Sequence, residues 1–372
     1  WQKFLWVLVF VVVTVISARG GLQNKPINFA HSQVFAVPAM NNLVLNSSFS
    51  FIQTIRRQSL PRDHFFSNAD EMLHLLNGYS AEKSVHLAVR PNVVLIILES
   101  FSQELVGAAN HGIGVTPFLD ELTKKSLFFS DNYANARRSI EGIGALLGGV
   151  PAMMNEPFIS SQYLTNYFLG IGTLLKPAGY QSHFFHGAHN SSMYFDQFMK
   201  SAGIEHYWGL NEYPDPSQYD GTWGIWDEPF LQWMKMKMDG FPEPFFASVF
   251  TLSSHSPFRV PEVFRGRFPK TFPDGVECEI CESAAYTDES LRRFFAEAEK
   301  SPWFSRTVFI ITADHTFKAM RSGGGGELSQ YRIPMWIYAP GFDLKKVDEN
   351  MVTQQVDILP TMIELAGVSH PE

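Results

Sequence analysis

Two apolar, strand-like runs in this sequence end in residue types that bind metal ions. The run Thr307–Ile311 leads into Asp314 and His315 of "TADHT", and the run "NVVLIIL" leads into Glu99. Adjacent strand residues point to opposite faces of a sheet, so a neighbouring aspartate and histidine converge only where the strand gives way to a loop. The carboxyl ends of parallel strands are where α/β proteins build their sites. We therefore expect these three side chains to share a site.

Two further residues are candidates for chemistry. His255 follows a third strand-like run, "FFASVFTLSS", and Ser139 opens "SIEGIGALLGG", a stretch of small residues that is typical of a helix. A serine at the N-cap of a helix lies beside free backbone N–H groups and the positive end of the helix dipole, which suits a nucleophile that attacks an anionic centre. Serine is also a favoured N-cap residue without any chemical role, so both interpretations of Ser139 stay open.

The polar groups at these strand and helix ends are more informative together than singly. Taken alone, Glu99 and Asp314 could cap helices, and His315 could be a loop histidine with ordinary hydrogen bonds. Two carboxylates, an imidazole and the hydroxyl of Ser139 form a mixed oxygen and nitrogen set that suits manganese or zinc. The combination therefore predicts one divalent metal site.

Composition and charge limit the class of protein. The chain has 372 residues, of which 45% are hydrophobic and 18% are charged, so it can bury the core of a large α/β domain. Its formal net charge is −8, which provides no basic surface of the kind that nucleic-acid binding requires. We therefore expect no nucleic acid partner.

Residues 1–18 contain an apolar run from Phe4 to Ala18, bounded by Lys3 and Arg19. A run of about fifteen residues is shorter than the roughly 20 that span a bilayer, but such a run could continue upstream. We expect the end of a transmembrane helix, with the core of a signal peptide or a buried core helix as alternatives. The first two interpretations place the rest of the chain outside the cytoplasm.

The remainder of the chain divides into two parts. Residues 19–87 are rich in Asn, Ser, Gln and Arg, and they are predicted to form a linker with short helices, for instance around Ala69–Leu76. Residues 88–372 alternate strand-like and helix-like segments, which predicts an α/β domain with a mostly parallel sheet sandwiched by helices. Its helix-like segments cover residues 116–126, 139–149, 163–179, 225–238, 283–300 and 354–367. Its strand-like segments cover residues 92–100, 180–187, 244–254, 306–314 and 332–341.

The two cysteines of the chain, Cys278 and Cys281, form one C-x-x-C motif in "VECEICES". Structural zinc requires four ligands, so a single pair of cysteines is a weak zinc signal. A local disulfide in an oxidising compartment is the prediction, and two free thiols are the alternative.

Several motifs resemble, in the same order, those of one known family: "PNVVLIILESF", a hydroxyl residue about 40 positions later, "TLSSHSPF", "YTDESLRRFF", "ITADHT" and "QVDILPTMIELAG". Over about residues 88–369 the chain resembles the extracellular catalytic domain of lipoteichoic acid synthases and related phosphoglycerol transferases. These enzymes are sulfatase-like members of the alkaline phosphatase superfamily. The resemblance implies the alkaline phosphatase/sulfatase-like α/β fold, and the apolar N-terminal run agrees with the membrane domain that precedes the catalytic domain in this family.

The resemblance also implies roles for individual residues. One divalent ion, manganese in the family with zinc or magnesium as alternatives, would be held by Glu99, Ser139, Asp314 and His315. The substrate phosphate or glycerol would be contacted by His255, and the rest of the head-group pocket would be formed by His186, Trp223 and Asp227. Ser139 stands where lipoteichoic acid synthases have threonine, so the subgroup to which the chain belongs stays open.

These roles predict a phosphotransferase that acts at the cell membrane, outside the cytoplasm. A divalent ion lowers the pKa of the Ser139 hydroxyl and offsets charge on the phosphoryl oxygens. Ser139 is expected to attack the phosphodiester of a phospholipid such as phosphatidylglycerol, so that a diacylglycerol-like alcohol leaves and a phospho-serine ester remains. A glycan, a polyol-phosphate acceptor or water then attacks that ester. His255 is expected to protonate the leaving oxygen or to stabilise the phosphoryl charge.

Four other functions are weighed against this one. Sulfatases resemble one another in having proline two residues and arginine four residues after the nucleophile, whereas Glu141 and Ile143 occupy these positions here. A two-metal phosphatase or nuclease needs about twice as many Asp and His ligands. A phosphoethanolamine transferase stays open, because details of the pocket select the head group. A catalytically inactive sensor or scaffold on the membrane would have no need of the complete ligand set.

Overall fold

The computed structural model describes residues 1–22, 26–35, 38–55, 57, 59–60, 66–68, 70–74, 87, 89–317, 326–344 and 351–368. The strands are β1 (Asn92–Leu98), β2 (Leu127–Tyr133), β3 (Gln181–His186), β4 (His206–Trp208), β5 (Phe245–Phe250), β6 (Thr307–Ala313), β7 (Arg332–Tyr338) and β8 (Thr353–Gln354). The helices are α1 (Gln2–Arg19), α2 (Pro38–Asn41), α3 (Ser47–Thr54), α5 (Pro117–Thr123), α6 (Ser139–Gly148), α7 (Ile171–Leu175), α8 (Phe195–Ser201), α9 (Asp227–Met238), α10 (Cys281–Ala298) and α11 (Ile358–Leu365).

Within these residues the strands form one eight-stranded sheet, in the order β4-β3-β5-β1-β6-β7-β2-β8. Neighbouring strands run parallel except at β7, which is antiparallel to both β6 and β2. All seven residues of β1 are buried. A strand that helices cover on both faces needs apolar side chains on both, which explains the continuous apolar run in its sequence. The prediction of an α/β fold with a mostly parallel sheet is confirmed.

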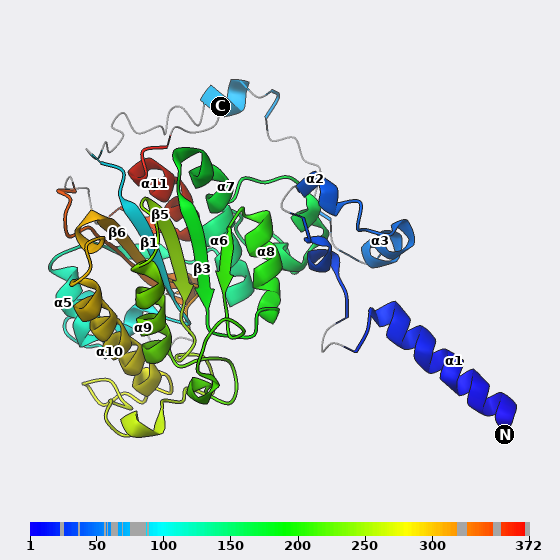
Figure 1. The fold of residues 1–372 in the computed structure, drawn as a ribbon. Coiled ribbons are helices and arrows are strands. Elements are labelled where there is room, and N and C mark those ends of the chain that lie inside the picture. The colour runs from blue at the N-terminus through cyan, green and yellow to red at the C-terminus, as the bar shows by residue number, and fades with distance from the viewer. Residues whose placement is uncertain are drawn as a thin grey trace.

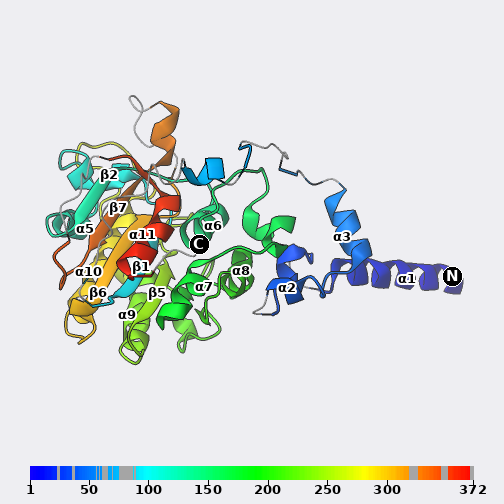
Figure 2. The ribbon, with the colours of Figure 1, turned by 90° about the horizontal axis from the view of Figure 1, so that it is seen from above.

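Helices cover both faces of the sheet (Figures 1 and 2). Val94 and Ile96 of β1 join a core cluster with residues of α5, α9 and α10. Val93 and Leu95 join a second cluster with residues of α6, α7, α8 and α11. Successive side chains of a strand alternate between faces, so one strand contributes to both layers. The carboxyl ends of β1, β3, β5 and β6 consequently meet at one edge of the sheet, which is the predicted location of the site.

The predicted helix over residues 163–179 is wrong in its extent. The structure has a 3-10 turn (Gln162–Thr165), the five-residue α7 and a second turn (Lys176–Ala178). A Cβ atom at Gly170 or Gly172 would lie 2.5 or 2.3 Å from the main chain that follows α8. The glycines therefore serve close packing of two chain segments, which interrupts the regular helix.

Three strands, at or next to the edges of the sheet, were not predicted from the sequence. β2 alternates irregularly between buried and partly exposed residues, and its register with β7 shifts between Phe129 and Asn132. β4 and β8 contain only three and two residues. Neither an irregular strand nor such short strands produce the regular apolar period by which strands are recognised.

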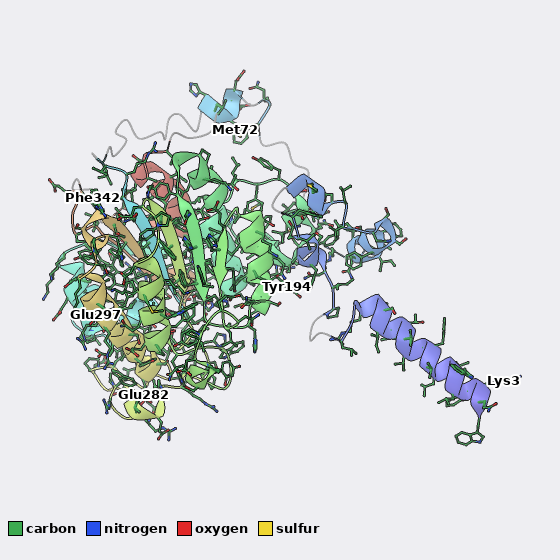
Figure 3. All side chains as sticks on the ribbon, in the orientation of Figure 1. Lys3, Met72, Tyr194, Glu282, Glu297 and Phe342 are labelled. Carbon is green, nitrogen blue, oxygen red and sulfur yellow. A yellow bond between two sulfur atoms is a disulfide. The ribbon has the colours of Figure 1, made fainter. Side chains whose placement is uncertain are left out.

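The N-terminal helix α1 extends away from the α/β domain, and none of its residues is buried (Figures 1 and 3). It is long and apolar enough to cross a membrane, so it is a candidate span and not the buried core helix weighed as an alternative. The short helices α2 and α3 follow in the predicted linker, and residues 70–74 are helical. The rest of the helical piece expected around Ala69–Leu76 lies outside the described residues.

Cys278 and Cys281 form a disulfide bond, so the predicted pairing is confirmed. Cys281 is the first residue of α10, and both cysteines are buried. The bond joins the loop before α10 to the first turn of that helix. Both cysteines of the chain are therefore used, and neither is a free thiol.

Candidate metal centre and active site

Strand register brings Glu99 and Asp314 together. β1 and β6 are parallel neighbours, and Leu98 pairs with Ala313 where the two strands end. The next residue of each strand therefore lies at the same level of the sheet edge. Glu99 and Asp314 are 1% and 0% exposed, and the N–H of Asp314 still donates to the carbonyl oxygen of Leu98 at 3.2 Å. Strand pairing thus accounts for their convergence.

The ligand atoms of Glu99, Asp314 and His315 all lie within 4.8 Å of one another. Nε2 of His315 is 3.3 Å from Oδ2 of Asp314 and 3.8 Å from Oε1 of Glu99. The Ser139 hydroxyl donates to Oε2 of Glu99 at 3.1 Å and lies 3.3 Å from Nε2 of His315. The structure therefore brings the four predicted metal-binding residues into one cluster.

The charges of this cluster do not balance within the protein alone. Burial and then the negative charge of Glu99 raise the pKa of Asp314 to about 7. Burial acts to lower the pKa of His315, but the charges of Asp314 and Glu99 outweigh it, so the net change is a rise. Oδ2 of Asp314 is buried and makes no hydrogen bond, although Nε2 of His315 lies 3.3 Å from it. A divalent cation would satisfy this oxygen and offset both carboxylates, so the donor set fits one such ion.

Ser139 is the first residue of α6, and the N-cap residue is Arg138. The predicted N-cap position of Ser139 is therefore wrong by one residue, because Arg138 has the extended backbone that precedes a helix. The Ser139 hydroxyl instead points to Glu99 and His315. The helix still places its positive dipole end beside the cluster, where it favours an anionic group.

Gly142 allows α6 to approach the metal-binding cluster. A Cβ atom at this position would lie 2.3 Å from the carbonyl oxygen of Asp314, which is far inside van der Waals contact. Glycine inside a helix costs about 1 kcal/mol relative to alanine, and the close approach to Asp314 explains its presence. A glycine in the middle of a helix-like stretch indicates a close contact, but the sequence does not show which segment Gly142 contacts.

Replacing Gly142 with alanine is expected to reduce kcat/KM by about a hundredfold, because α6 must move away from β6 and take Ser139 with it. Gly144→Ala is the matched control in the same helix, since its Cβ would have no neighbour closer than 3.8 Å. The control should keep its activity and its melting temperature. Equal turnover by the two purified variants would show that the contact at Gly142 does not position the nucleophile.

Neighbouring loops hold the two carboxylates in place. Ser100 donates its N–H to Oδ1 of Asp314 at 2.8 Å and its hydroxyl to Oε1 of Glu99 at 2.6 Å. Its φ of 56° lies in the left-handed region, which is unfavourable for a residue other than glycine. Gln355 donates its side-chain amide to the carbonyl oxygens of Ala313 and Asp314 at 2.8 and 2.6 Å. The sequence did not predict these contacts, because hydrogen bonds between distant segments leave no local pattern.

His255 and Trp223 lie together on loops beyond the carboxyl end of β5. Their ring centroids are 4.1 Å apart, and the Trp223 indole N–H donates to the carbonyl oxygen of Ser256 at 2.7 Å. Both side chains are partly accessible to solvent, with Trp223 39% exposed. Ser254 joins this loop to the metal-binding cluster, because its hydroxyl donates to the carbonyl oxygen of Glu99 at 2.6 Å. These two predicted pocket residues therefore share one accessible rim.

Asp227 is buried behind that rim. Its carboxylate accepts hydrogen bonds from the N–H groups of Leu252 and Ser253, at 2.8 and 3.2 Å, and from the Thr287 hydroxyl at 2.7 Å. Burial raises its pKa, and these hydrogen bonds oppose the rise. Asp227 is 3% exposed, and its hydrogen bonds hold the loop that bears His255.

His186, the last residue of β3, is fully buried. Its ring packs against Phe195 and Phe250, and Nδ1 lies 3.1 Å from the Tyr207 hydroxyl. Nε2 has no hydrogen-bond partner, and burial lowers the pKa to about 3. The structure does not bring His186 to the other predicted pocket residues. A histidine that ends a strand looks the same in the sequence whether it faces a core or a site, and here it lies in an aromatic core.

Burial of His186 is expected to make the folded state sensitive to acid. The pKa of His186 falls from 6.5 to about 3 on folding. The free energy of unfolding is therefore unaffected by this group above pH 6.5, and it decreases as the pH falls from 6.5 toward 3. The expected loss at pH 5 is about 2 kcal/mol. Burial also lowers the pKa of His183 to about 3, so both proteins should lose stability at pH 5. Urea denaturation in the presence of a chelator, at pH 7.5 and pH 5, should show a loss that is about 2 kcal/mol larger in the wild type than in His186→Leu. Equal losses in both proteins would contradict the assignment to the core.

Comparisons of the sequence identify its family. The sequence model of the Sulfatase family matches residues 91–368. Lipoteichoic acid synthase 1 from Bacillus subtilis is 27% identical over 299 residues, which cover 74% of this chain and 46% of that protein. Phosphoglycerol transferase I from Citrobacter koseri is 25% identical over 326 residues, which cover 83% of this chain and 41% of that protein. The chain thus spans about half the length of the curated relatives it matches.

Solved structures share the fold. A protein in the alkaline phosphatase superfamily from Vibrio parahaemolyticus has a TM-score of 0.66 and 27% identity, covering 77% of this chain and 68% of that chain. The lipoteichoic acid synthase LtaP from Listeria monocytogenes has a TM-score of 0.64 and 19% identity, covering 76% and 73%. The C-terminal periplasmic domain of EcEptC from Escherichia coli has a TM-score of 0.57 and 16% identity, covering 77% and 85%. The predicted resemblance is confirmed, and the chain belongs to the sulfatase family within the alkaline phosphatase superfamily.

Proposed function

We propose that this chain is the catalytic part of a membrane-bound, metal-dependent phosphotransferase that acts outside the cytoplasm. It moves a phosphoglycerol or similar head group from a phospholipid such as phosphatidylglycerol to an acceptor alcohol. The observation that carries the proposal is the position of the Ser139 hydroxyl, which lies within hydrogen-bond distance of Glu99 and His315 at the N-terminus of α6. Relatives that are named lipoteichoic acid synthase and phosphoglycerol transferase support the substrate class.

Manganese is the proposed ion, with zinc or magnesium as alternatives. Its ligands would be Glu99, Asp314, His315 and the oxygen of Ser139. When bound, such an ion lowers the pKa of a coordinated hydroxyl and offsets charge on phosphoryl oxygens. The unpartnered Oδ2 of Asp314 and the repulsion between two buried carboxylates support a cation at this point. A zinc complex of the EcEptC periplasmic domain is among the structures with a similar fold.

Ser139 acts as the nucleophile in this proposal. After its hydroxyl has lost its proton to a water molecule, a bond forms between Oγ and phosphorus, and the bond from phosphorus to the diacylglycerol oxygen breaks. His255 gives the leaving oxygen a proton. The hydroxyl of a glycan or of a polyol phosphate then attacks the phospho-serine ester, and Ser139 is released. Attack by water would make the same site a hydrolase.

The proposed location is the outer side of a cell membrane. The candidate span α1 supports attachment to a bilayer, and the disulfide between Cys278 and Cys281 suits an oxidising compartment. The neighbouring EcEptC structure is described as a periplasmic domain. A sulfatase is disfavoured by Glu141 and Ile143, which stand where the sulfatase nucleophile motif has proline and arginine.

The test is the release of diacylglycerol from vesicles by the purified chain. Vesicles that contain fluorescent phosphatidylglycerol, or its phosphatidylethanolamine counterpart, are incubated with manganese, with zinc, with magnesium or with a chelator. The proposal expects metal-dependent release that is greater from phosphatidylglycerol. Preference for phosphatidylethanolamine would make the chain a phosphoethanolamine transferase. No release from either lipid with any ion would overturn the enzyme assignment in favour of an inactive membrane-surface protein.

A further inference from the structure

The beginning of the linker is docked onto the catalytic domain. Phe29 and Ala30 are 3% and 0% exposed, and Gln33 is 1% exposed. The Ser201 hydroxyl of α8 donates to the side-chain oxygen of Gln33 at 2.8 Å, and the side-chain amide of Asn41 donates to the same oxygen at 2.8 Å. These buried polar contacts hold the start of the linker in one position relative to the sheet.

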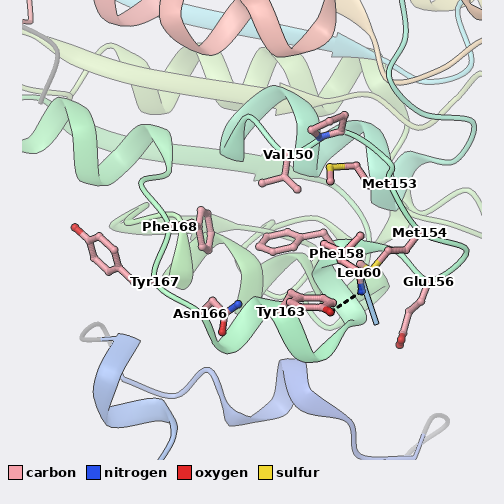
Figure 4. Close-up of a pocket in the computed structure, with 11 residues that line it drawn as sticks. Leu60, Val150, Met153, Met154, Glu156, Phe158, Tyr163, Asn166, Tyr167 and Phe168 are labelled. Carbon is pink, nitrogen blue, oxygen red and sulfur yellow. Dashed lines mark hydrogen bonds between the residues drawn. The ribbon is translucent and has the colours of Figure 1, made fainter. Parts of the chain in front are cut away.

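The end of the described linker is held at a second point. Arg57 forms an ion pair with Glu156. The N–H of Leu60 donates to the Tyr163 hydroxyl at 2.8 Å, beside a mainly apolar pocket of about 250 Å³ (Figure 4). Both partners belong to the segment that connects α6 to α7. The linker is therefore attached to the catalytic domain on both sides of α2 and α3.

Between these two points the linker has an unusual surface. From Pro26 to Ile55 the sequence contains no Asp, Glu, Lys or Arg. In α3, Phe49 faces inward and meets Phe29, with ring centroids 6.0 Å apart. Phe51, Ile52 and Ile55 face outward instead, with exposures of 68%, 68% and 60%. We call these three side chains the α3 face. A cluster of large apolar groups without charges marks a contact with another apolar phase.

A lipid bilayer is the apolar phase that the candidate span α1 would enter. The N–H of Ile27 donates to the carbonyl oxygen of Arg19, the last residue of α1, at 3.1 Å. Phe29 follows two residues later and packs against α3, so α3 is tied to the end of α1 by short contacts. Lys25 and Arg56 flank the uncharged stretch in the sequence, and basic residues at such positions suit phosphate head groups.

From these observations we infer that α3 lies in the membrane interface, with the α3 face inserted among the lipid acyl chains as a second attachment beside α1. Insertion of the α3 face would strengthen the attachment that α1 provides, because each Å² of apolar surface removed from water contributes roughly 25 cal/mol of binding free energy. Because the linker is docked at both ends, contact of the α3 face with lipid fixes the orientation of the whole catalytic domain. The inference rests on the proposed membrane attachment through α1 and not on the proposed chemistry.

Depth-dependent fluorescence quenching tests the inference on the full chain in vesicles. An environment-sensitive dye is attached to Ile52→Cys, and lipids with a nitroxide in the acyl chain are included in the bilayer. Both native cysteines are bonded to each other, so they do not compete for the dye. The matched control is Val263→Cys, because Val263 is 66% exposed and lies on the turn Glu262–Phe264, remote in sequence from α1.

We expect at least twofold stronger quenching of the dye at position 52 than at position 263, together with a shift of its emission to the blue. Equal quenching at both positions would overturn the inference. The inference would also be overturned if unlabelled Ile52→Cys formed a disulfide between two copies while the labelled protein showed no quenching by lipid, because a second copy would then cover the α3 face. Unchanged circular dichroism of the labelled proteins establishes that they are folded. The readout needs no turnover, so failure of the proposed chemistry leaves this test unaffected.

Discussion

Replacing Asp314 with asparagine is expected to abolish metal binding and to reduce turnover by more than about a hundredfold. Loss of a residue that only hydrogen-bonds to a metal ligand already costs up to about that factor, and Asp314 is a proposed ligand itself. Asparagine keeps the oxygen that accepts N–H groups of Ser100 and His315, at 2.8 and 2.7 Å, so the fold should be retained. It replaces the unpartnered Oδ2 with a neutral amide, which is a poor ligand for a divalent ion. Manganese should therefore raise the melting temperature of the wild type and not that of the variant.

The same variant should be more stable than the wild type when no metal is present. The pKa of Asp314 is raised from 3.8 to about 7 in the folded protein, so this carboxyl removes stability progressively as the pH rises from 3.8 to 7. Asparagine has no such cost, and the gain at pH 8 is expected to be up to about 4 kcal/mol. Urea denaturation in a chelator at pH 4 and pH 8 measures it.

Asp288→Asn is the control for a buried aspartate outside the metal-binding cluster. Its pKa is also raised to about 7, chiefly by burial, and its carboxylate accepts the N–H groups of Phe118 and Leu119. This variant should keep the manganese-dependent rise in melting temperature. If Asp314→Asn also kept the manganese-dependent rise in melting temperature, or retained full activity, the assignment of Asp314 as a metal ligand would be wrong.

Replacing Ser139 with alanine should reduce turnover by a factor of about 10⁴ to 10⁶, as removal of a nucleophile does in other enzymes. Three ligands of the proposed ion remain, so manganese should still stabilise this variant. Mass spectrometry of the wild type, incubated with phosphatidylglycerol and quenched in acid, should find a glycerophosphoryl group on the peptide that contains Ser139. The alanine variant should carry no such group.

Ser139→Thr separates loss of the hydroxyl from loss of the residue. Threonine keeps the hydroxyl that lies 3.1 Å from Glu99 and 3.3 Å from His315, and adds a methyl group at a buried position. We expect this variant to retain measurable turnover and a covalent intermediate. Turnover of the alanine variant at the wild-type rate would exclude Ser139 as the nucleophile.

The sequence was sufficient to predict five of the eight strands and the cluster at the edge of the sheet, for a physical reason. Buried parallel strands are apolar throughout, so the first polar residue after each run marks where the strand ends. Glu99 and Asp314 follow two such runs, and adjacent strands in register bring these residues to one level. The antiparallel direction of β7 was not predictable in this way, because an apolar run does not indicate the direction of the strand.

The roles of pocket residues were harder to predict, because they depend on which way a side chain points. His186 and Asp227 are polar residues near strand or helix ends, as a ligand-binding residue would be. The structure uses His186 in an aromatic core, and it uses Asp227 to bind backbone N–H groups of the loop before His255. Gly142 shows the opposite case, since its role is set entirely by the distance to a carbonyl oxygen of another segment.

The contact of Gln355 with the carbonyl oxygens of Ala313 and Asp314 bears on where the ion is acquired. Glu99, Asp314 and the amide that braces the end of β6 come from distant parts of the chain, so the ligands meet only when nearly all of it has folded. An unfolded chain offers no preformed site, and divalent ions are selected partly by their availability. A domain that folds after export would therefore draw its ion from the supply outside the cytoplasm, and metal content should follow the growth medium.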